Sequence, residues 1–328
     1  MMKTWKTLAM ILILLLLAGC AGSSPQKDEE DGKVRIGILQ MMTHGSLDEA
    51  RQGFLDGLAE AGYVEGENLI VDFQNPEGDQ SNMSTMADHL IAEDLDLILA
   101  IATPPAQQLY NVNQNTPILG TAITDYADAG LVDSNEHPGG LISGTSDNCP
   151  MDAQLDLLLS VKADVKTLGI LYTSSEVNSE IQANQMQAEC EKRGIEVRIV
   201  TIPDKTVIND AMTALAADCD AVYIPTDNNI ASAMGSVDVI SRERSLITLV
   251  GVSDMVQNGG CLSLGVNYYD LGKQTAEMAV RVLNGEDIGA MPIGYDKSGT
   301  VYYNSDTLEA IGIQLTDDFK ASAIDMRN

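Results

Sequence analysis

The sequence predicts an α/β protein with two Rossmann-like lobes, each built on a parallel sheet. Short and nearly continuous apolar segments alternate along the chain with segments whose apolar residues recur at helical spacing. Such strands are typical of parallel sheets that helices cover on both faces. The alternation runs through one series and starts again at Thr167, which indicates a second sheet. The chain has 328 residues, of which 45% are apolar, enough for two domains with cores.

The first series begins with the apolar run 34–40, which predicts a strand. A helix over 46–62 follows, with a capping-box pattern at Ser46 and Glu49 and a C-cap at Gly62. Further strands are predicted at 68–74, 96–102, 117–123 and 140–146, with helices at about 81–93, after Thr103 and after Pro150.

The second series is predicted in the same way. Its strands lie at 167–173, 195–202, 220–225, 246–252 and 261–267, and its helices at 176–194, 206–218, 227–241 and 268–285. The chain shows no short-period repeat that would indicate a solenoid.

The first 19 residues have the pattern of a secretory signal peptide. MMKTWK supplies two lysines, and the apolar run 7–18 is too short for a typical membrane span. LAGC followed by AGSS resembles a bacterial lipobox, which implies cleavage before Cys20 and a lipid on that residue. Residues 20–32 are polar and read as a flexible tether. We therefore expect an extracytoplasmic protein, lipid-anchored to the cell membrane. An uncleaved anchor is the alternative, and it leaves the rest of the chain outside as well.

Charge and cysteine spacing exclude several classes of function. The chain carries 19 Lys and Arg against 48 Asp and Glu, a net charge of −29, which argues against a nucleic-acid partner. Cys149, Cys190, Cys219 and Cys261 form no C-x-x-C pair. We expect separate buried thiols rather than a disulfide framework, and neither a metal site nor a cofactor.

Polar clusters follow several predicted strands where each strand meets the next helix. They are MMTHGS, TPPAQQ, TSSEVNS and TDNN. Ligands of open α/β sheets bind at this edge, where helix N-termini offer free N–H groups. Any one cluster could be only a helix cap, but four at the same edge exceed what capping needs. We expect them to converge on one ligand-binding cleft.

Motifs of the common hydrolases are absent from the sequence. GTSDN and GVSDM fail the G-x-S-x-G pattern at its last position, and the chain has no H-E-x-x-H or Walker A sequence. It has three histidines, none beside an evident nucleophile. A binding protein is therefore favoured over an enzyme.

A collinear set of segments resembles a known family. The segments are THGSLDEARQGFLDGLAEAGYVEGENL, ILAIATPPAQ, TDYADAGLV, HPGGLISGTSD, LGILYTSSEVNS, VYIPTDNN and YYDLGKQTAEMAVRVLNGE, and together they cover nearly all of 34–312. They are similar to the substrate-binding lipoproteins of bacterial ABC importers, in the family that includes tryptophan- and tyrosine-binding components.

This resemblance implies a type I periplasmic-binding fold with two lobes joined by a hinge. The first lobe would span 33–143 plus about 268–290, and the second 144–266 plus about 291–328. The protein would be a monomer that captures a small amino-acid-like ligand, expected to be aromatic (tryptophan, tyrosine or phenylalanine), and delivers it to a permease with its ATPase subunit. Two alternatives remain open: a ligand-sensing receptor component, and a binding protein for a non-aromatic amino acid or another small molecule.

An amino acid needs donors for its carboxylate and a carboxylate for its ammonium group. For the first we expect Thr103, the backbone of Ala106, and Ser174, Ser175 and Asn178; for the second Asp227, with Glu176 and Asp254 in reserve. Met41, Met42, Pro104 and Tyr126 could face an aromatic ring. The full candidate set adds Gln40, His44, Thr124, Asp125, Ser146, Asp147, Thr226 and Asn228.

One position departs from the family pattern. The family usually shows Thr-Asp-Pro where this chain has Thr124, Asp125 and Tyr126. A tyrosine beside the cleft would narrow it or stack on a ligand ring, so the resemblance does not fix the ligand.

Overall fold

The computed structural model describes residues 32–296 and 299–327. The predicted signal peptide at 1–19 and Cys20, the predicted site of the lipid, lie outside the described residues, as does nearly all of the predicted tether at 20–32. Within the described ranges, no helix combines the length and the apolar character that crossing a membrane requires. The elements from Val34 onwards belong to one unit, distinct from residues 1–33.

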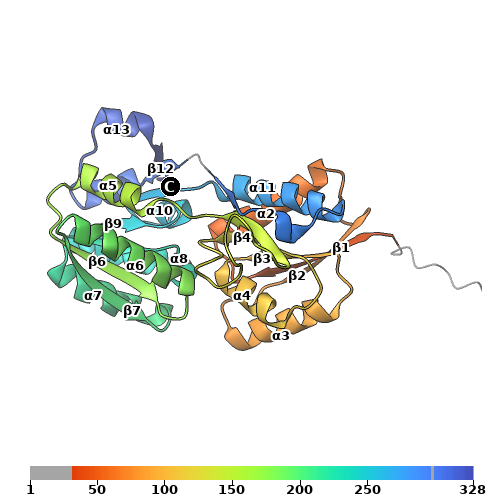
Figure 1. Cartoon of the computed structure of the whole chain (residues 1–328). Coiled ribbons are helices and arrows are strands. Elements are labelled where there is room, and N and C mark those ends of the chain that lie inside the picture. The colour runs from red at the N-terminus through yellow and green to blue at the C-terminus, as the bar shows by residue number, and fades with distance from the viewer. Residues whose placement is uncertain (1–31, 297–298, 328) are drawn as a thin grey trace, which may run out of the picture. The chain divides into compact units, whose positions relative to one another are not determined.

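The first lobe is built on a sheet of six strands in the order β11-β5-β4-β3-β1-β2, all parallel (Figure 1). Its elements up to the first crossing are β1 (Val34–Gln40), α2 (Gly45–Glu60), β2 (Leu69–Gln74), α3 (Gln80–Ala92), β3 (Leu97–Ile101), α4 (Thr103–Val112), β4 (Ile118–Ile123) and β5 (Ile142–Ser146). Every residue of β3, β4 and β5 is buried, as expected of strands covered on both faces.

The second lobe is built on a sheet of seven strands in the order β13-β12-β10-β9-β8-β6-β7. Its elements are α5 (Met151–Val161), β6 (Thr167–Thr173), α6 (Val177–Lys192), β7 (Glu196–Ile202), η1 (Lys205–Val207), α7 (Ile208–Asp218), β8 (Ala221–Ile224), α8 (Asn228–Ala231), α9 (Met234–Arg244), β9 (Ile247–Val250), α10 (Ser253–Gln257) and β10 (Leu262–Gly265). The parallel sheet predicted for this part of the chain is confirmed from β6 to β10.

The chain then returns to the first lobe and crosses back. α11 (Tyr268–Leu283), η2 (Ile288–Ala290) and β11 (Gly294–Tyr295) come first, followed by β12 (Thr300–Tyr303), α12 (Ser305–Ala310), α13 (Asp317–Ser322) and β13 (Ile324–Asp325). β11 pairs with β5, whereas β12 pairs antiparallel with β10. These connections, together with the one after β5, cross between the two sheets, and the result is the two-lobed α/β fold that the sequence predicts.

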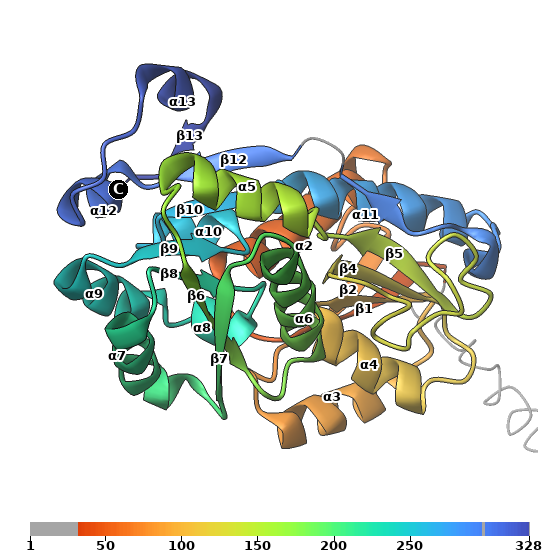
Figure 2. The same ribbon diagram turned by 60° about the vertical axis from the view of Figure 1, so that its left-hand side comes forward.

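Two glycines let α2 and α11 pack at backbone contact, as the two views show side by side (Figures 1 and 2). A Cβ atom on Gly53 would lie 2.0 Å from the carbonyl oxygen of Tyr269, and one on Gly272 would lie 2.0 Å from that of Ala50. Because no other residue fits these contacts, the pair of helices is fixed closely. The N-terminal ends of both helices carry residues of the candidate site described below, so this packing also positions the site.

Some local predictions are wrong. Helix α2 begins one residue before Ser46 and has His44 as its N-cap, with no side-chain cap hydrogen bond, so the capping box at Ser46 does not form. The predicted helix at 227–241 is two helices, α8 and α9.

Of the four cysteines beyond the signal region, Cys149, Cys190 and Cys261 are buried free thiols, and Cys219 is a half-buried one.

Candidate functional site

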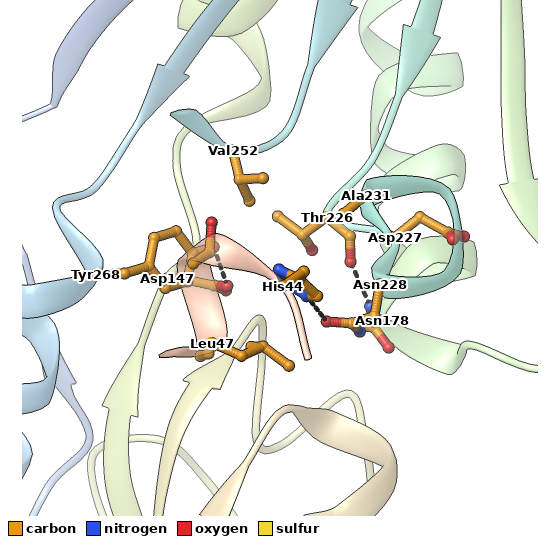
Figure 3. A pocket seen from close by; sticks show the side chains of 12 residues that line it. His44, Leu47, Asp147, Asn178, Thr226, Asp227, Asn228, Ala231, Val252 and Tyr268 are labelled. Carbon is orange, nitrogen blue, oxygen red and sulfur yellow. Dashed lines mark hydrogen bonds between the residues drawn. The ribbon is translucent and has the colours of Figure 1, made fainter. Parts of the chain in front are cut away.

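One cavity lies where strand ends and helix N-termini of both lobes meet (Figure 3). Its walls are His44, Ser46, Leu47, Ala122 and Tyr268 from the first lobe, Asp147 from the crossing after β5, and Asn178, Thr226, Asp227, Asn228, Ala231 and Val252 from the second lobe. The free space within it is about 10 Å³, close to the room that one water molecule needs. A larger ligand therefore enters only when the lobes move apart.

Several polar atoms around this cavity have no hydrogen-bond partner. They are His44 Nδ1, Ser46 Oγ, Asp147 Oδ1 and Asn178 Oδ1, all buried. Buried polar groups in folded proteins nearly always have partners, and each one left without costs roughly 1–3 kcal/mol. Their gathering at one cavity indicates that a polar ligand completes the site.

Asp147 is the cavity carboxylate with an open position. Its side chain is buried, and its Oδ2 accepts a 2.7 Å hydrogen bond from the Tyr268 hydroxyl, while Oδ1 has no partner. Burial raises the pKa of Asp147 to about 6, although the Tyr268 hydrogen bond opposes the rise. A buried carboxylate with one satisfied and one open oxygen suits a cationic ligand group.

Glu176 braces the second-lobe wall rather than facing the cavity. Its Oε2 accepts from the backbone and side-chain nitrogens of Asn228 at 3.0 and 2.6 Å, and its Oε1 accepts from those of Asn229 at 2.9 and 2.8 Å. Burial, and then the charge of Asp227, raise the pKa of Glu176 against these hydrogen bonds. Both carboxylate oxygens are used within the lobe.

Asp227 is likewise saturated, although it lines the cavity. It caps α8 by accepting from Ile230 N at 2.9 Å, and it accepts from the backbone nitrogen and the hydroxyl of Thr173 at 2.6 and 2.9 Å. Burial raises its pKa in spite of these bonds. This geometry does not favour the predicted role of Asp227 as the partner of an ammonium group, because its oxygens already have donors.

Polar contacts link the two lobes beside the cavity. His44 Nε2 lies 3.1 Å from Asn228 Oδ1, and His44 Nδ1 lies 4.0 Å from Asp254 Oδ2. The hydroxyls of Thr124 and Thr226 lie 3.1 Å apart. These contacts join side chains of the first lobe to side chains of the second, so they exist only when the lobes are closed.

The structure brings part of the predicted set to the cavity. His44, Asp147, Asn178, Thr226, Asp227 and Asn228 line it. Gln40, Thr103, Pro104, Ala106, Thr124, Asp125, Tyr126, Ser146, Ser174, Ser175, Glu176 and Asp254 do not line it. Of the residues expected to face a ring, Met41 and Met42 do not line it either, and both are buried.

Most of these residues are engaged or placed elsewhere. Gln40 forms hydrogen bonds with Met42, Asp48 and Arg51. The Ser146 hydroxyl donates to Thr124 O, and the Asp125 carboxylate accepts from Asn135. Ser174 is exposed, and Pro104 and Ser175 line a separate groove of about 340 Å³. In the TSSEVNS cluster, Ser174 and Ser175 are therefore exposed and Thr173 is buried against Asp227, and only Asn178 reaches the cavity.

Tyr126 lies in the core of the first lobe and not beside the cleft. It is fully buried, and its hydroxyl donates to Thr145 O at 3.0 Å. A Cβ atom on Gly120 or on Gly144 would lie 2.5 Å from the Tyr126 hydroxyl oxygen, so these glycines make the room that it needs. The expectation that Tyr126 narrows the cleft is therefore not supported by its place in the structure.

Sequence reasoning missed Ser46, Leu47, Ala122, Ala231, Val252 and Tyr268 among the cavity residues. Tyr268 could have been found, because it begins a helix directly after a predicted strand, the same rule that selected the other clusters. Ala122 has a positive φ of 56°, a strained backbone of the kind that gathers at functional sites, and no sequence pattern announces it. No cluster of His, Cys, Asp and Glu able to hold a metal occurs in the described part of the chain.

Comparison with known proteins places the chain in a family. Residues 35–327 match the model of the ABC transporter substrate binding protein family. A tyrosine-binding protein of Clostridioides difficile is 35% identical over 325 residues, 96% of this chain and 94% of that one. The ABC domain of Streptococcus pneumoniae solved in complex with L-tryptophan is 35% identical, with a TM-score of 0.85, over 89% of this chain and 98% of that one.

A third relative differs in conformation. A ligand-free, open substrate-binding protein with adhesive properties from Clostridium difficile is 36% identical and covers 89% of this chain and 99% of that one, yet its TM-score is 0.69. Identity and coverage nearly equal those of the tryptophan complex, so the lower TM-score reflects a different arrangement of the structure rather than a more distant sequence. The matches agree with the two-lobed fold. The chain belongs to the family of ABC transporter substrate-binding proteins, which act outside the cytoplasm and are not enzymes.

Proposed function

We propose that this protein captures a zwitterionic α-amino acid, with an aromatic side chain, between its lobes and delivers it to the permease of an ABC importer. The observation that carries the proposal is the pair of orphaned groups in one cavity, Asp147 Oδ1 and Ser46 Oγ. Asp147 Oδ1 is a carboxylate oxygen that can accept a hydrogen bond from an ammonium group, and Ser46 Oγ is a hydroxyl at a helix N-terminus that can donate to a carboxylate. An amino acid carries both of these groups.

The ammonium group of the ligand binds Asp147. Its Oδ1 lacks a donor, and Tyr268 holds the other oxygen in place. An ammonium supplies both the missing hydrogen bond and the opposite charge that a buried carboxylate needs. This assignment replaces Asp227, whose oxygens serve Thr173 and Ile230.

The carboxylate of the ligand binds the N-terminus of α2. This helix has 16 residues, no side chain caps it, and Ser46 Oγ in its first turn is buried without a partner. Free N–H groups and the positive end of the helix dipole favour an anion there. The start of α4, which the sequence favoured, has an orphaned Thr103 Oγ1, but Thr103 does not line the cavity.

An aromatic side chain fits the remaining walls and the relatives. Leu47, Ala122, Ala231, Val252 and the Tyr268 ring supply apolar surface on both lobes. One relative is named as tyrosine-binding, and another was solved with L-tryptophan. Because the free space holds about one water molecule, an aromatic ring requires the side chains that line the cavity to move aside.

The proposal includes the anchor and the lobe boundaries. Lipid on Cys20 and the tether at 20–32 would keep the monomeric protein beside its permease. The first lobe would span 33–143 plus about 268–290 and the second 144–266 plus about 291–328. We extend the first lobe to Ser146 and to Tyr295, because β5 and β11 lie in its sheet.

The test uses the absence of tryptophan from residues 21–328, since Trp5 is the only one in the chain. The purified segment is excited at a wavelength that tyrosine does not absorb, before and after L-tryptophan is added. Calorimetric titration with L-tyrosine, L-phenylalanine and non-aromatic amino acids completes the panel. Stoichiometric binding of an aromatic amino acid supports the proposal. No heat and no emission change with any amino acid would overturn it.

A further inference from the structure

His44 sits at the contact between the lobes, at the start of α2. Its side chain is 6% exposed, and its Nε2 lies 3.1 Å from Asn228 Oδ1 in the second lobe (Figure 3). The side-chain nitrogen of Asn228 donates to Glu176, so the oxygen that faces His44 can only accept. Nε2 therefore carries the hydrogen of this bond.

The second ring nitrogen has no hydrogen-bond partner. His44 Nδ1 is buried, and the nearest carboxylate oxygen, Asp254 Oδ2, is 4.0 Å away, beyond hydrogen-bond reach. Asp254 Oδ1 already accepts from Asn258 at 3.0 Å. When Nε2 is the donor, Nδ1 of the neutral ring carries a lone pair and no hydrogen. Protonation of Nδ1 would create a buried N–H group without an acceptor.

The charged groups around His44 are Asp48 on α2 and Asp254 on α10, with Glu49 beside Asp254 and Glu176 behind Asn228. The negative charges of Asp254 and Asp48 favour a protonated ring. Burial acts in the opposite direction and prevails, so the pKa of His44 lies below its ordinary value although Asn228 and Asp254 oppose the shift. The closed form thus holds a neutral imidazole.

His44 also separates two hollows. It lines the ligand cavity, and it lines a second hollow of about 260 Å³ that runs from Thr43 to Asn258. Moving the ring would open the cavity toward this second hollow. His44 is therefore at once a link between the lobes and part of the wall that shields the ligand.

We propose that His44 is the latch between the lobes and that it closes only as a neutral imidazole, so closure over the ligand expels the proton that His44 carries in the open form. The inference rests on the proposed capture of a ligand between the lobes. In the open form, an exposed histidine titrates near pH 6.5. Because the closed form binds the proton more weakly, closure is favoured above that pH and weakens as the pH falls through it.

The experiment measures calorimetric affinity for L-tryptophan and L-tyrosine from about pH 8 to pH 5, the range in which histidine titrates. It compares the wild type with His44→Gln, Asp254→Asn and His89→Gln. Glutamine retains an N–H for Asn228 but does not titrate. His89 pairs with Asp72 at 2.8 Å within the first lobe, which makes it a matched control.

We expect the affinity of the wild type to fall more steeply with acidification than that of His44→Gln, by up to about tenfold per pH unit. Asp147 adds a pH dependence of the same sign to both, so the difference between the two slopes belongs to His44. Asp254→Asn removes an attracting charge and should steepen the fall, and His89→Gln should match the wild type. Equal slopes for wild type and His44→Gln would overturn the latch and leave the proposed function standing. Absence of binding at every pH would overturn the proposed function, and the latch with it.

A second measurement uses the wild type only, so it still tests the proposal if the His44→Gln variant does not fold. The chain has three histidines, so nitrogen NMR of the histidine-labelled wild type resolves each ring. In the saturated complex, His44 should remain a neutral Nε2–H tautomer below pH 6.5, where an unperturbed histidine becomes protonated. A protonated His44 in the closed complex at that pH would refute the proposal.

Discussion

Replacing Asp147 by asparagine tests the proposed site most directly, because binding and stability should move in opposite directions. Truncating one partner of a buried charge pair costs about 2–5 kcal/mol of binding free energy, or roughly 30- to 4,000-fold in affinity. The ligand-free protein should respond differently. Burial in the closed cavity raises the pKa of Asp147 from 3.8 to about 6, so at neutral pH the ionised carboxylate destabilises this closed arrangement when no ligand is bound.

The size of that penalty follows from linkage. A rise of about two pH units corresponds to about 3 kcal/mol at neutral pH, and it disappears as the pH falls toward the unfolded-state pKa. Asparagine carries no charge, and its oxygen can still accept from the Tyr268 hydroxyl. Asp147→Asn should therefore raise the free energy of unfolding by up to about 3 kcal/mol while it abolishes tight binding.

The pH dependence of binding gives a further check on Asp147. A bound ammonium lowers the pKa of the carboxylate, so affinity should be full above about pH 6 and fall about tenfold per pH unit below it. Calorimetric titration and urea denaturation of wild type, Asp147→Asn and the exposed control Asp164→Asn measure both quantities. The reasoning is refuted if Asp147→Asn loses stability together with affinity, or if Asp227→Asn abolishes binding and Asp147→Asn does not.

Three further predictions concern lobe closure and the Tyr126 core. A Cβ atom in Gly45→Ala would lie 2.2 Å from Asp254 Oδ1 across the lobe contact, so small-angle scattering should show impaired closure of this variant with saturating ligand. The control is Gly235→Ala, whose Cβ atom would meet no atom within 4 Å. Equal scattering of the two variants would contradict the contact. Thr124→Val removes the hydroxyl contact with Thr226. Because one hydrogen bond typically contributes about 0.5–1.5 kcal/mol, the calorimetric affinity for the ligand should weaken about 2- to 10-fold, with little change in urea denaturation. An unchanged affinity would show that this contact does not support closure. Tyr126→Phe leaves Thr145 O without its donor, so the free energy of unfolding should fall by about 1–3 kcal/mol with ligand affinity unchanged; a change in ligand preference would return Tyr126 to the cleft.

The structure brings several of the predicted residues together at the sheet edge, but it separates other residues of the same loops from the cavity. The rule that ligands bind at the carboxyl ends of parallel strands led to His44, Asn178, Thr226 and Asn228, which all line the cavity. It could not separate them from Ser174, which the same loop turns toward solvent. A difference of a few residues along a turn reverses the direction of a side chain, and composition does not record that direction.

Roles were harder to predict than positions. Asp147 and Asp227 are both buried acids beside strand ends, and only the hydrogen-bond partners distinguish them. Thr173 and Ile230 occupy the oxygens of Asp227, whereas Tyr268 leaves one oxygen of Asp147 open. Apart from the local contact of Ile230 with Asp227, this saturation depends on residues more than 50 positions away in sequence, for which a single chain gives no signal.

What the sequence by itself determined is the fold: buried strands and amphipathic helices follow from local periodicity, and their alternation dictates parallel sheets. The sequence also determined the class of protein, through a long collinear resemblance that the family match confirms. Only the tertiary structure decided that Tyr126 belongs to the core, that α2 offers an uncapped N-terminus, and that Asp147 keeps an open oxygen. These features depend on contacts between distant segments, and such contacts exist only once the lobes have packed.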